Sequence, residues 1–256
     1  MSDWSAREYL KFKEERTRPA RDLLAHVQLE QARVVVDLGC GPGNSTELLV
    51  ARYPDAEVIG VDSSLDMLHH ARNRSRNCSF IQANLATWKP AGRVDLFFSS
   101  GAFQWVPDHQ TVLQRFVQVL PECGVLAVQI PDITETPALA LIREVASKGP
   151  WADNPVMCKA VRDQMPTTDS YYDALKPLCA HVDIWHTIYN HVLAGTDAIV
   201  EWFMGSALRP LLSALDPEAS AHFLAAFAAE IDRQHTRRVD GRVLLELPRL
   251  FIVAMR

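Results

Sequence analysis

The sequence of 256 residues lacks the patterns by which cysteine builds a site. Its five cysteines, at positions 40, 78, 123, 158 and 179, form no C-x-x-C pair and have no zinc-type spacing to histidine. An odd, dispersed set predicts reduced and mostly buried thiols of an intracellular protein, and it argues against a disulfide framework.

Long apolar runs and an excess of positive charge are also missing. No stretch approaches the roughly 18 apolar residues of a membrane helix, and the opening MSDWSAREYL has no signal-peptide core. The net charge is −5, and the one basic stretch, KFKEERTRPAR, is diluted by two glutamates. We therefore expect a cytoplasmic protein, a monomer or weak homo-oligomer, with neither nucleic acid nor a membrane as its partner.

The first half of the chain does contain a regular alternation of β-branched and amphipathic segments. Strands are predicted at residues 33–38, 57–62, 79–84, 94–99 and 124–130. Helices follow from a cap at Asn44-Ser45-Thr46, from a cap at Ser63 or Ser64, and over about 108–120. Such alternation predicts an α/β fold, with a mostly parallel sheet and helices on both faces.

The second half breaks this rhythm. Six prolines between 131 and 177 separate short helical pieces, which predicts a helical insertion or lid over 131–180. Residues 181–193 alternate like a strand, 249–255 read as a final strand, and Asp216-Pro217 starts a long helix. The expected organisation is an N-terminal helical segment over 1–30, a cofactor-binding core over 31–130, the insertion, and a C-terminal part over 181–256 that completes the sheet and the substrate pocket.

Only eleven glycines occur, yet three of them alternate in D-L-G-C-G-P-G-N, residues 37–44, directly after the first strand. A dinucleotide loop, G-x-G-x-x-G, would need its third glycine where Asn44 stands. The form D-x-G-x-G-x-G instead resembles the first motif of class I methyltransferases, which bind S-adenosylmethionine. Glycine here suggests a backbone that approaches a ligand closely, so that a Cβ at Gly39 or Gly41 would intrude.

Two polar residues follow at the ends of the next strands. Asp62, about twenty residues on, is placed to accept ribose hydroxyls, which supports a nucleoside without choosing between cofactors. Asn84 ends the third predicted strand, where the resemblance implies contact with the adenine edge through the side chain and the next backbone N–H, that of Leu85.

The resemblance narrows when the whole chain is read. The segments WSAREYLKFKEERTRPA, QWVPDH, LAVQIPD, REVA, VDIW and PRLFIVA are similar to the trans-aconitate 2-methyltransferase family, from Trp4 to Met255. That family transfers a methyl group from S-adenosylmethionine to a carboxylate of trans-aconitate, giving a monomethyl ester. The resemblance therefore implies a Rossmann-like class I methyltransferase fold, S-adenosylmethionine as cofactor, and a small tricarboxylate as substrate.

The resemblance and the strand ends together assign the candidate site residues. The expected cofactor-binding residues are Tyr9, Arg16, Gly39, Cys40, Gly41, Asn44, Asp62, Ser63, Met67, Asn84, Leu85, Ser100 and Trp105. Gln104, Tyr172 and Arg209, with Arg18 as a further candidate, are the expected partners of the carboxylates that are not methylated, because arginine forks suit carboxylates.

Neither a general base nor a metal is expected. A carboxylate with a pKa near 4 is already ionised at neutral pH and needs no base to become a nucleophile. On an alternating strand His181 and His191 face one side and His186 the other, which argues against zinc.

Two segments depart from the family pattern. Pro121-Glu122-Cys123-Gly124 replaces a P-G-G turn, and Pro137-Ala138-Leu139 stands where the family tends toward Pro-x-His. The second departure bears on which acid accepts the methyl group, and it does not affect the predicted fold or cofactor. Three alternatives stay open: transfer to another small acid, a nicotinamide-dependent dehydrogenase that shares the fold and Asp62, and a non-catalytic module that binds S-adenosylmethionine.

Overall fold

The computed structural model describes residues 4–74, 78–132, 136–162 and 165–256. The chain divides into two compact units, each described here by itself. The sheet unit comprises Lys13–Pro131, Pro166–Thr187 and Arg249–Arg256, and the helical unit comprises Met1–Phe12, Asp132–Met165 and Ile188–Pro248. The segments expected at 1–30 and 131–180 are thus each shared between the two units.

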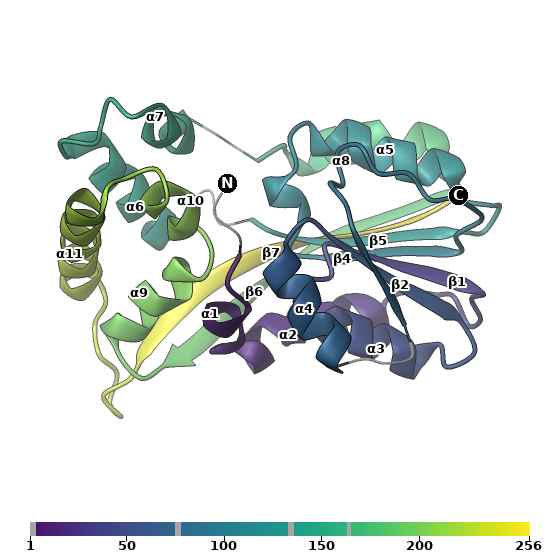
Figure 1. The fold of residues 1–256 in the computed structure, drawn as a ribbon, viewed down its shortest axis with the longest axis horizontal. Helices are drawn as coiled ribbons and strands as arrows, with labels where there is room; N and C mark the ends of the chain where they lie inside the picture. Colours follow the sequence, from purple (N-terminus) through teal and green to yellow (C-terminus); the bar gives the residue numbers. More distant parts are fainter. Residues whose placement is uncertain (1–3, 75–77, 133–135, 163–164) are drawn as a thin grey trace. The chain divides into compact units, whose positions relative to one another are not determined.

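A seven-stranded sheet has the order β3-β2-β1-β4-β5-β7-β6 (Figure 1). Its strands are β1 (Val34–Leu38), β2 (Glu57–Asp62), β3 (Ser79–Gln82), β4 (Leu96–Ser100), β5 (Val125–Pro131), β6 (His181–Leu193) and β7 (Val243–Met255). The first five pair in parallel, and β7 runs antiparallel to β5 with Gln129 opposite Phe251. This topology confirms the predicted fold class, and the strand order reverses between β1 and β4, where open α/β sheets bind ligands.

Burial explains where the strand predictions were accurate and where they were not. The apolar strands β1, β4 and β5 are buried almost throughout, as expected for strands covered on both faces. The third strand ends at Gln82, so Asn84 lies in the turn beyond it. The last strand begins at Val243, six residues before the predicted start at 249. Its first half alternates between buried residues such as Leu245 and exposed ones such as Glu246, the period-two pattern of a strand with one covered face.

In the sheet unit, helices cover both faces (Figure 1). One face carries α2 (Lys13–Ala25), α3 (Asn44–Arg52) and α4 (Leu65–Arg74), and the other carries α5 (His109–Val119) and α8 (Thr168–Leu175). Two short 3-10 turns, η1 (Phe103–Trp105) and η2 (Lys176–Leu178), complete the unit.

Helix α8 comes from the predicted insertion but packs on α5. Three side chains of α5 reach it: His109 Nε2 lies 2.5 Å from the Tyr171 hydroxyl, Gln110 donates to Ser170 Oγ at 2.8 Å, and Gln114 donates to a backbone carbonyl of α8 at 2.7 Å. Burial lowers the pKa of His109, which favours the neutral imidazole in this contact.

The departure at Pro121–Gly124 is a tight turn before β5. The Gly124 N–H donates to the Pro121 carbonyl at 2.9 Å, and Cys123 has a φ of +63°. A positive φ at the third turn position is the conformation that glycine adopts most easily, so Cys123 occupies a glycine-like position.

The helical unit has a core of its own. It contains α1 (Ala6–Leu10), α6 (Pro137–Lys148), α7 (Pro155–Arg162), α9 (Thr196–Met204), α10 (Leu208–Leu212) and α11 (Pro217–Gln234). Trp202 and Phe203 of α9 are buried together with Phe223 and Phe227 of α11. As predicted, α11 begins with Pro217 after the Asp216 cap, whose carboxylate accepts the Ala219 N–H at 2.8 Å.

The N-terminal residues pack within this helical unit. The Phe12 ring lies 4.9 Å from the Trp202 ring, and Lys11 forms ion pairs with Glu8 at 2.8 Å and Glu201 at 3.3 Å. Over the described ranges, the chain forms no helix with the length and hydropathy to cross a membrane.

Candidate active site

The glycine loop connects β1 to α3, and its first two glycines have different reasons to be glycine. Both have positive φ, +74° at Gly39 and +53° at Gly41. A Cβ at Gly39 would lie 2.2 Å from Ala102 Cβ, so the obstruction predicted there comes from the protein itself. At Gly41, apart from its own atoms and those of its two chain neighbours, no atom of the described residues lies within 4 Å of an added Cβ, which leaves open space beside the loop.

Asp62 braces this loop from the end of β2. Its carboxylate accepts the Gly41 N–H at 2.9 Å and the Ser64 N–H at 2.9 Å. Each carboxylate oxygen has two lone pairs, so one carboxylate can accept more than two hydrogen bonds. Ser64 caps α4 by accepting the Met67 N–H at 3.2 Å, while Ser63 is exposed and the Met67 side chain is buried.

Asp37, at the end of β1, is a buried acid that the sequence analysis did not assign. One of its oxygens accepts the hydroxyls of Ser45 at 2.8 Å and Thr46 at 2.7 Å. The other oxygen, Oδ1, has no hydrogen-bond partner in the described part of the chain. Burial raises the pKa of Asp37 to about 6, and the nearby charge of Asp62 acts in the same direction.

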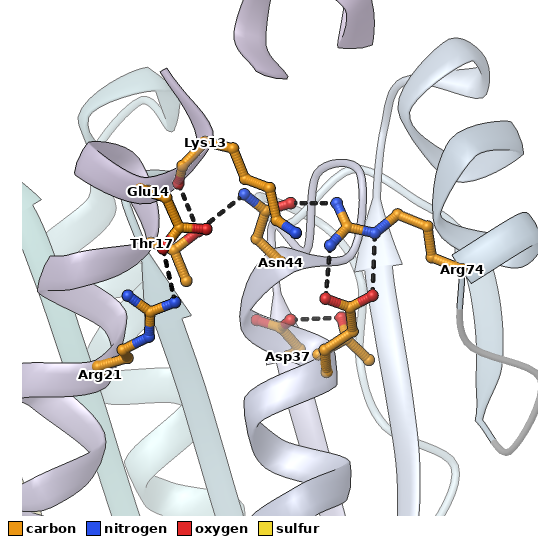
Figure 2. Close-up of polar contacts among 9 residues, drawn as sticks. Lys13, Glu14, Thr17, Arg21, Asp37, Asn44 and Arg74 are labelled. Carbon is orange, nitrogen blue, oxygen red and sulfur yellow. Dashed lines mark hydrogen bonds and ion pairs between the residues drawn. The ribbon is translucent and has the colours of Figure 1, made fainter. Parts of the chain in front are cut away.

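The residues predicted to cap α3, Asn44, Ser45 and Thr46, make other contacts. The helix begins after Gly43 without a side-chain cap, and the Asn44 side chain connects two neighbouring helices (Figure 2). Its amide donates to Thr17 Oγ1 of α2 at 3.0 Å and accepts from Arg74 Nη1 of α4 at 2.6 Å. Arg74 also binds both carboxylate oxygens of Glu47, at 3.0 and 2.5 Å. The backbone N–H of Asn44 lies in the first helical turn, where N–H groups have no intrahelical acceptor.

The turn after β3 is closed by Asn84. Its carbonyl accepts the N–H groups of Thr87 at 3.0 Å and Trp88 at 2.8 Å, and its side-chain oxygen accepts the Ala86 N–H at 2.9 Å. Carbonyl and N–H point in opposite directions across a trans peptide. Because the Asn84 carbonyl points into the turn, the Leu85 N–H points out of it.

A polar group also lies at the carboxyl end of β4. Ser100 Oγ donates to Gln129 Oε1 of β5 at 3.1 Å, and Gln104 Nε2 donates to the Gly101 carbonyl at 2.7 Å. The Gln129 Nε2 and Gln104 Oε1 atoms are buried and lack partners among the described residues. The sequence analysis missed Gln129, although a glutamine inside the apolar run VLAVQIP was a signal for it.

The remaining candidates are divided between the units. Arg16 on α2 is buried and Tyr172 on α8 is exposed, both in the sheet unit. Arg18 is exposed, with Asp22 at 4.0 Å. Tyr9 on α1 and Arg209 on α10 belong to the helical unit. The sheet unit thus brings together the glycine loop, Asp62, the turn after β3 and the end of β4, with Cys40 buried in the loop and Trp105 exposed after β4.

This strand order, with a D-x-G-x-G-x-G loop braced by an acid at the end of the next strand, defines a class I methyltransferase fold. A family model described as a methyltransferase domain matches residues 35–124. The YcgJ protein from Bacillus subtilis has a TM-score of 0.59 at 14% identity, covering 93% of this chain and 98% of that one. Coclaurine N-methyltransferase, bound to N-methylheliamine and SAH, has a TM-score of 0.54 at 14% identity, covering 94% and 73%. These two likenesses concern the fold alone.

Sequence relatives give the particular family. Trans-aconitate 2-methyltransferase from Rhodopseudomonas palustris (strain HaA2) is 51% identical over 256 residues, covering 100% of both chains. The protein of the same name from Agrobacterium fabrum (strain C58 / ATCC 33970) is 48% identical over 253 residues, covering 99% of both. The chain belongs to the trans-aconitate 2-methyltransferase family, as its sequence motifs predicted.

Proposed function

We propose that this chain transfers a methyl group from S-adenosylmethionine to a carboxylate of trans-aconitate, forming the monomethyl ester. The observation that carries the proposal is the pairing of Asp62 with Gly41. This hydrogen bond fixes the loop backbone beside open space, at the carboxyl end of the sheet where a nucleoside would lie. The relatives named for this activity, with which the chain aligns from end to end, support the choice of acceptor.

The residues of the sheet unit fit the cofactor. Asp62 would accept the ribose hydroxyls, the Leu85 N–H and the Asn84 side chain would bind adenine, and the backbone at Gly41 would lie against the rest of the nucleoside. Further contacts are proposed for Tyr9, Arg16, Gly39, Cys40, Asn44 through its N–H, Ser63, Met67, Ser100 and Trp105. When bound, the cofactor supplies an electrophilic methyl group on a sulfonium.

The substrate carboxylate has to be oriented toward the methyl group, but it needs no general base to become a nucleophile. It is ionised at neutral pH, so the side chains around it need to hold it in line and exclude water. Good alignment of reacting atoms can lower a barrier by about 7–11 kcal/mol. Gln104, Tyr172 and Arg209 are the proposed partners of the carboxylates that stay free. The unpaired amide atoms of Gln104 and Gln129 support a polar ligand at the end of β4.

The test is methyl transfer from labelled S-adenosylmethionine to trans-aconitate, cis-aconitate, citrate, isocitrate and itaconate, with the esters identified by mass spectrometry. The expected result is one monomethyl ester, formed preferentially from trans-aconitate. Preference for another acid would keep the reaction and change the acceptor. Cofactor binding without transfer to any acid would contradict the proposal and favour a non-catalytic module.

The dehydrogenase alternative has a separate test. Thermal unfolding is compared with S-adenosylhomocysteine, NAD and NADP added in turn, because a ligand that binds the folded state raises the unfolding temperature. We expect stabilisation by S-adenosylhomocysteine alone, and stabilisation by a nicotinamide cofactor alone would overturn the cofactor assignment.

A further inference from the structure

One arginine on α5 holds the turn that follows β3. Arg115 Nη1 donates to the Ala86 carbonyl at 2.7 Å, and its Nη2 donates to the Leu85 carbonyl at 2.8 Å and the Trp88 carbonyl at 3.2 Å. Three carbonyls of one short turn therefore converge on a single guanidinium from a helix that begins more than twenty residues later in the chain.

Aromatic packing fixes this guanidinium in place. It lies over the Phe116 ring, 5.4 Å from the centroid, and the Trp88 ring lies 6.1 Å from the same ring. Phe116 is fully buried and packs on Phe97 of β4 at 4.9 Å. A planar fork can stack on a ring and reach several acceptors at once, which the single ammonium of lysine cannot do.

The consequence concerns the direction of one N–H group. The N–H groups of Thr87 and Trp88 hold the Asn84 carbonyl inside the turn, and Arg115 holds the Leu85 carbonyl. With both neighbouring peptide planes fixed, the Leu85 N–H keeps its outward direction at the carboxyl edge of the sheet. Such a fixed donor pairs with a ring nitrogen that carries a lone pair and is opposed by one that carries a hydrogen.

We propose that Arg115 is a positioning residue for adenine recognition. By fixing the Leu85 carbonyl, and with it the orientation of Leu85, Arg115 makes the site select adenine, whose N1 is an acceptor, over hypoxanthine, whose N1 carries a hydrogen. The inference rests on the proposed function, since it assumes that a nucleoside cofactor binds at this edge. The contacts of Arg115 described above are with three backbone carbonyls and the Phe116 ring, and we propose no contact between Arg115 and the ligand.

The test compares Arg115→Lys with Arg72→Lys as a matched control. Arg72 also reaches a backbone carbonyl, that of Phe80, but through one exposed contact of 3.4 Å. Calorimetry measures the Kd of S-adenosylhomocysteine and of its hypoxanthine analogue, S-inosylhomocysteine. For Arg115→Lys we expect the affinity for S-adenosylhomocysteine to fall about tenfold, a loss of about 1.4 kcal/mol of binding free energy. The ratio of the Kd of S-inosylhomocysteine to that of S-adenosylhomocysteine should fall by a similar factor.

Arg72→Lys should keep both the affinity and the preference of the wild type. The KM for S-adenosylmethionine of Arg115→Lys should rise with the Kd, whereas the KM for the acid should not. An unchanged base preference in Arg115→Lys overturns the inference, and so does an equal loss of affinity for both bases, which a merely structural role would produce.

A measurement on the wild type covers the case in which Arg115→Lys does not fold. S-adenosylhomocysteine should slow hydrogen exchange at the Leu85 amide, and S-inosylhomocysteine at equal concentration should not. Equal protection by both ligands, or by neither while S-adenosylhomocysteine binds, overturns the inference alone. If the wild type binds no S-adenosylhomocysteine at all, the proposed function fails and this inference fails with it.

Discussion

Replacing Gly39 and Gly41 by alanine should damage different properties of the protein. Both positions have positive φ, which costs a residue with a Cβ about 1–2 kcal/mol. At Gly39 the new methyl group would also lie 2.2 Å from Ala102 Cβ, and overpacking of this kind costs about 1–3 kcal/mol. The free energy of unfolding should therefore fall by about 2–5 kcal/mol in Gly39→Ala, and by about 1–2 kcal/mol in Gly41→Ala.

Gly41→Ala should lose more ligand affinity than Gly39→Ala, although it loses less stability. The alanine methyl at position 41 would enter space that contains no atom of the described residues and that we propose for the cofactor. We expect its Kd for S-adenosylhomocysteine to weaken by more than about tenfold, which corresponds to 1.4 kcal/mol. Urea unfolding measures the stability, and calorimetry measures the affinity of each variant that folds.

Gly92→Ala is the matched control, because Gly92 has neither a positive φ nor a neighbour within 4 Å among the described residues. It should change neither measurement. If Gly41→Ala binds the ligand as tightly as Gly92→Ala, the space at the loop does not hold the cofactor. If Gly39→Ala is as stable as Gly41→Ala, the contact with Ala102 does not limit the residue at position 39.

Three further substitutions test the proposed ribose ligand, the buried acid of β1 and the turn before β5. Asp62→Ala should weaken binding of S-adenosylhomocysteine by about 1.5–3 kcal/mol through loss of charge-assisted hydrogen bonds, and an unchanged calorimetric Kd would remove Asp62 from the site. Between pH 3.8 and about 6 the folded state keeps a proton on Asp37 that the unfolded chain has lost, so this residue destabilises the fold as pH rises. The unfolding free energy of the wild type, relative to that of Asp37→Asn, should fall by about 3 kcal/mol from about pH 4 to about pH 7, and a flat difference in urea titrations would refute the burial argument. Cys123→Gly relieves a positive φ and should raise the unfolding free energy by about 0.5–1 kcal/mol, whereas a loss of stability would show that the thiol side chain contributes to packing.

The positions of the parallel strands along the chain were accessible from the sequence because hydrophobic period and glycine placement are local signals. The strands from 33 to 130 and the strand at 181–193 follow from this reasoning. The first half of β7 was missed, although Val243, Leu245 and Leu247 alternate with exposed residues. Pro248 separates it from the apolar run at 249–255, and proline is unusual inside a strand. The position of α8 on α5 was beyond prediction, since it depends on contacts of side chains about sixty residues apart.

At the site, sequence spacing placed residues at strand ends but did not say which partners they would have. Asp62 and Gly41 meet as their positions suggested. Asn44, expected as a cap and a cofactor ligand, has its amide bound to Thr17 and Arg74, which lie 27 and 30 residues away. Asp37 was read as part of a motif, whereas the structure shows a buried acid under the first turn of α3. Competition between distant side chains for the same polar group is set by packing, and a single sequence does not encode it in any local pattern.

The site that we propose depends on backbone donors whose directions are fixed by side chains behind them. Asp62 holds the Gly41 peptide, Arg115 and the Asn84 side chain hold the peptide that follows Leu85, and Asn44 ties the start of α3 to its neighbours. Backbone N–H groups carry no side-chain identity, so selectivity for the ligand comes from the directions in which they point. Substitution of Arg115 should therefore change cofactor affinity without removing any atom that we propose to touch the ligand, because three carbonyls of the turn depend on this one side chain.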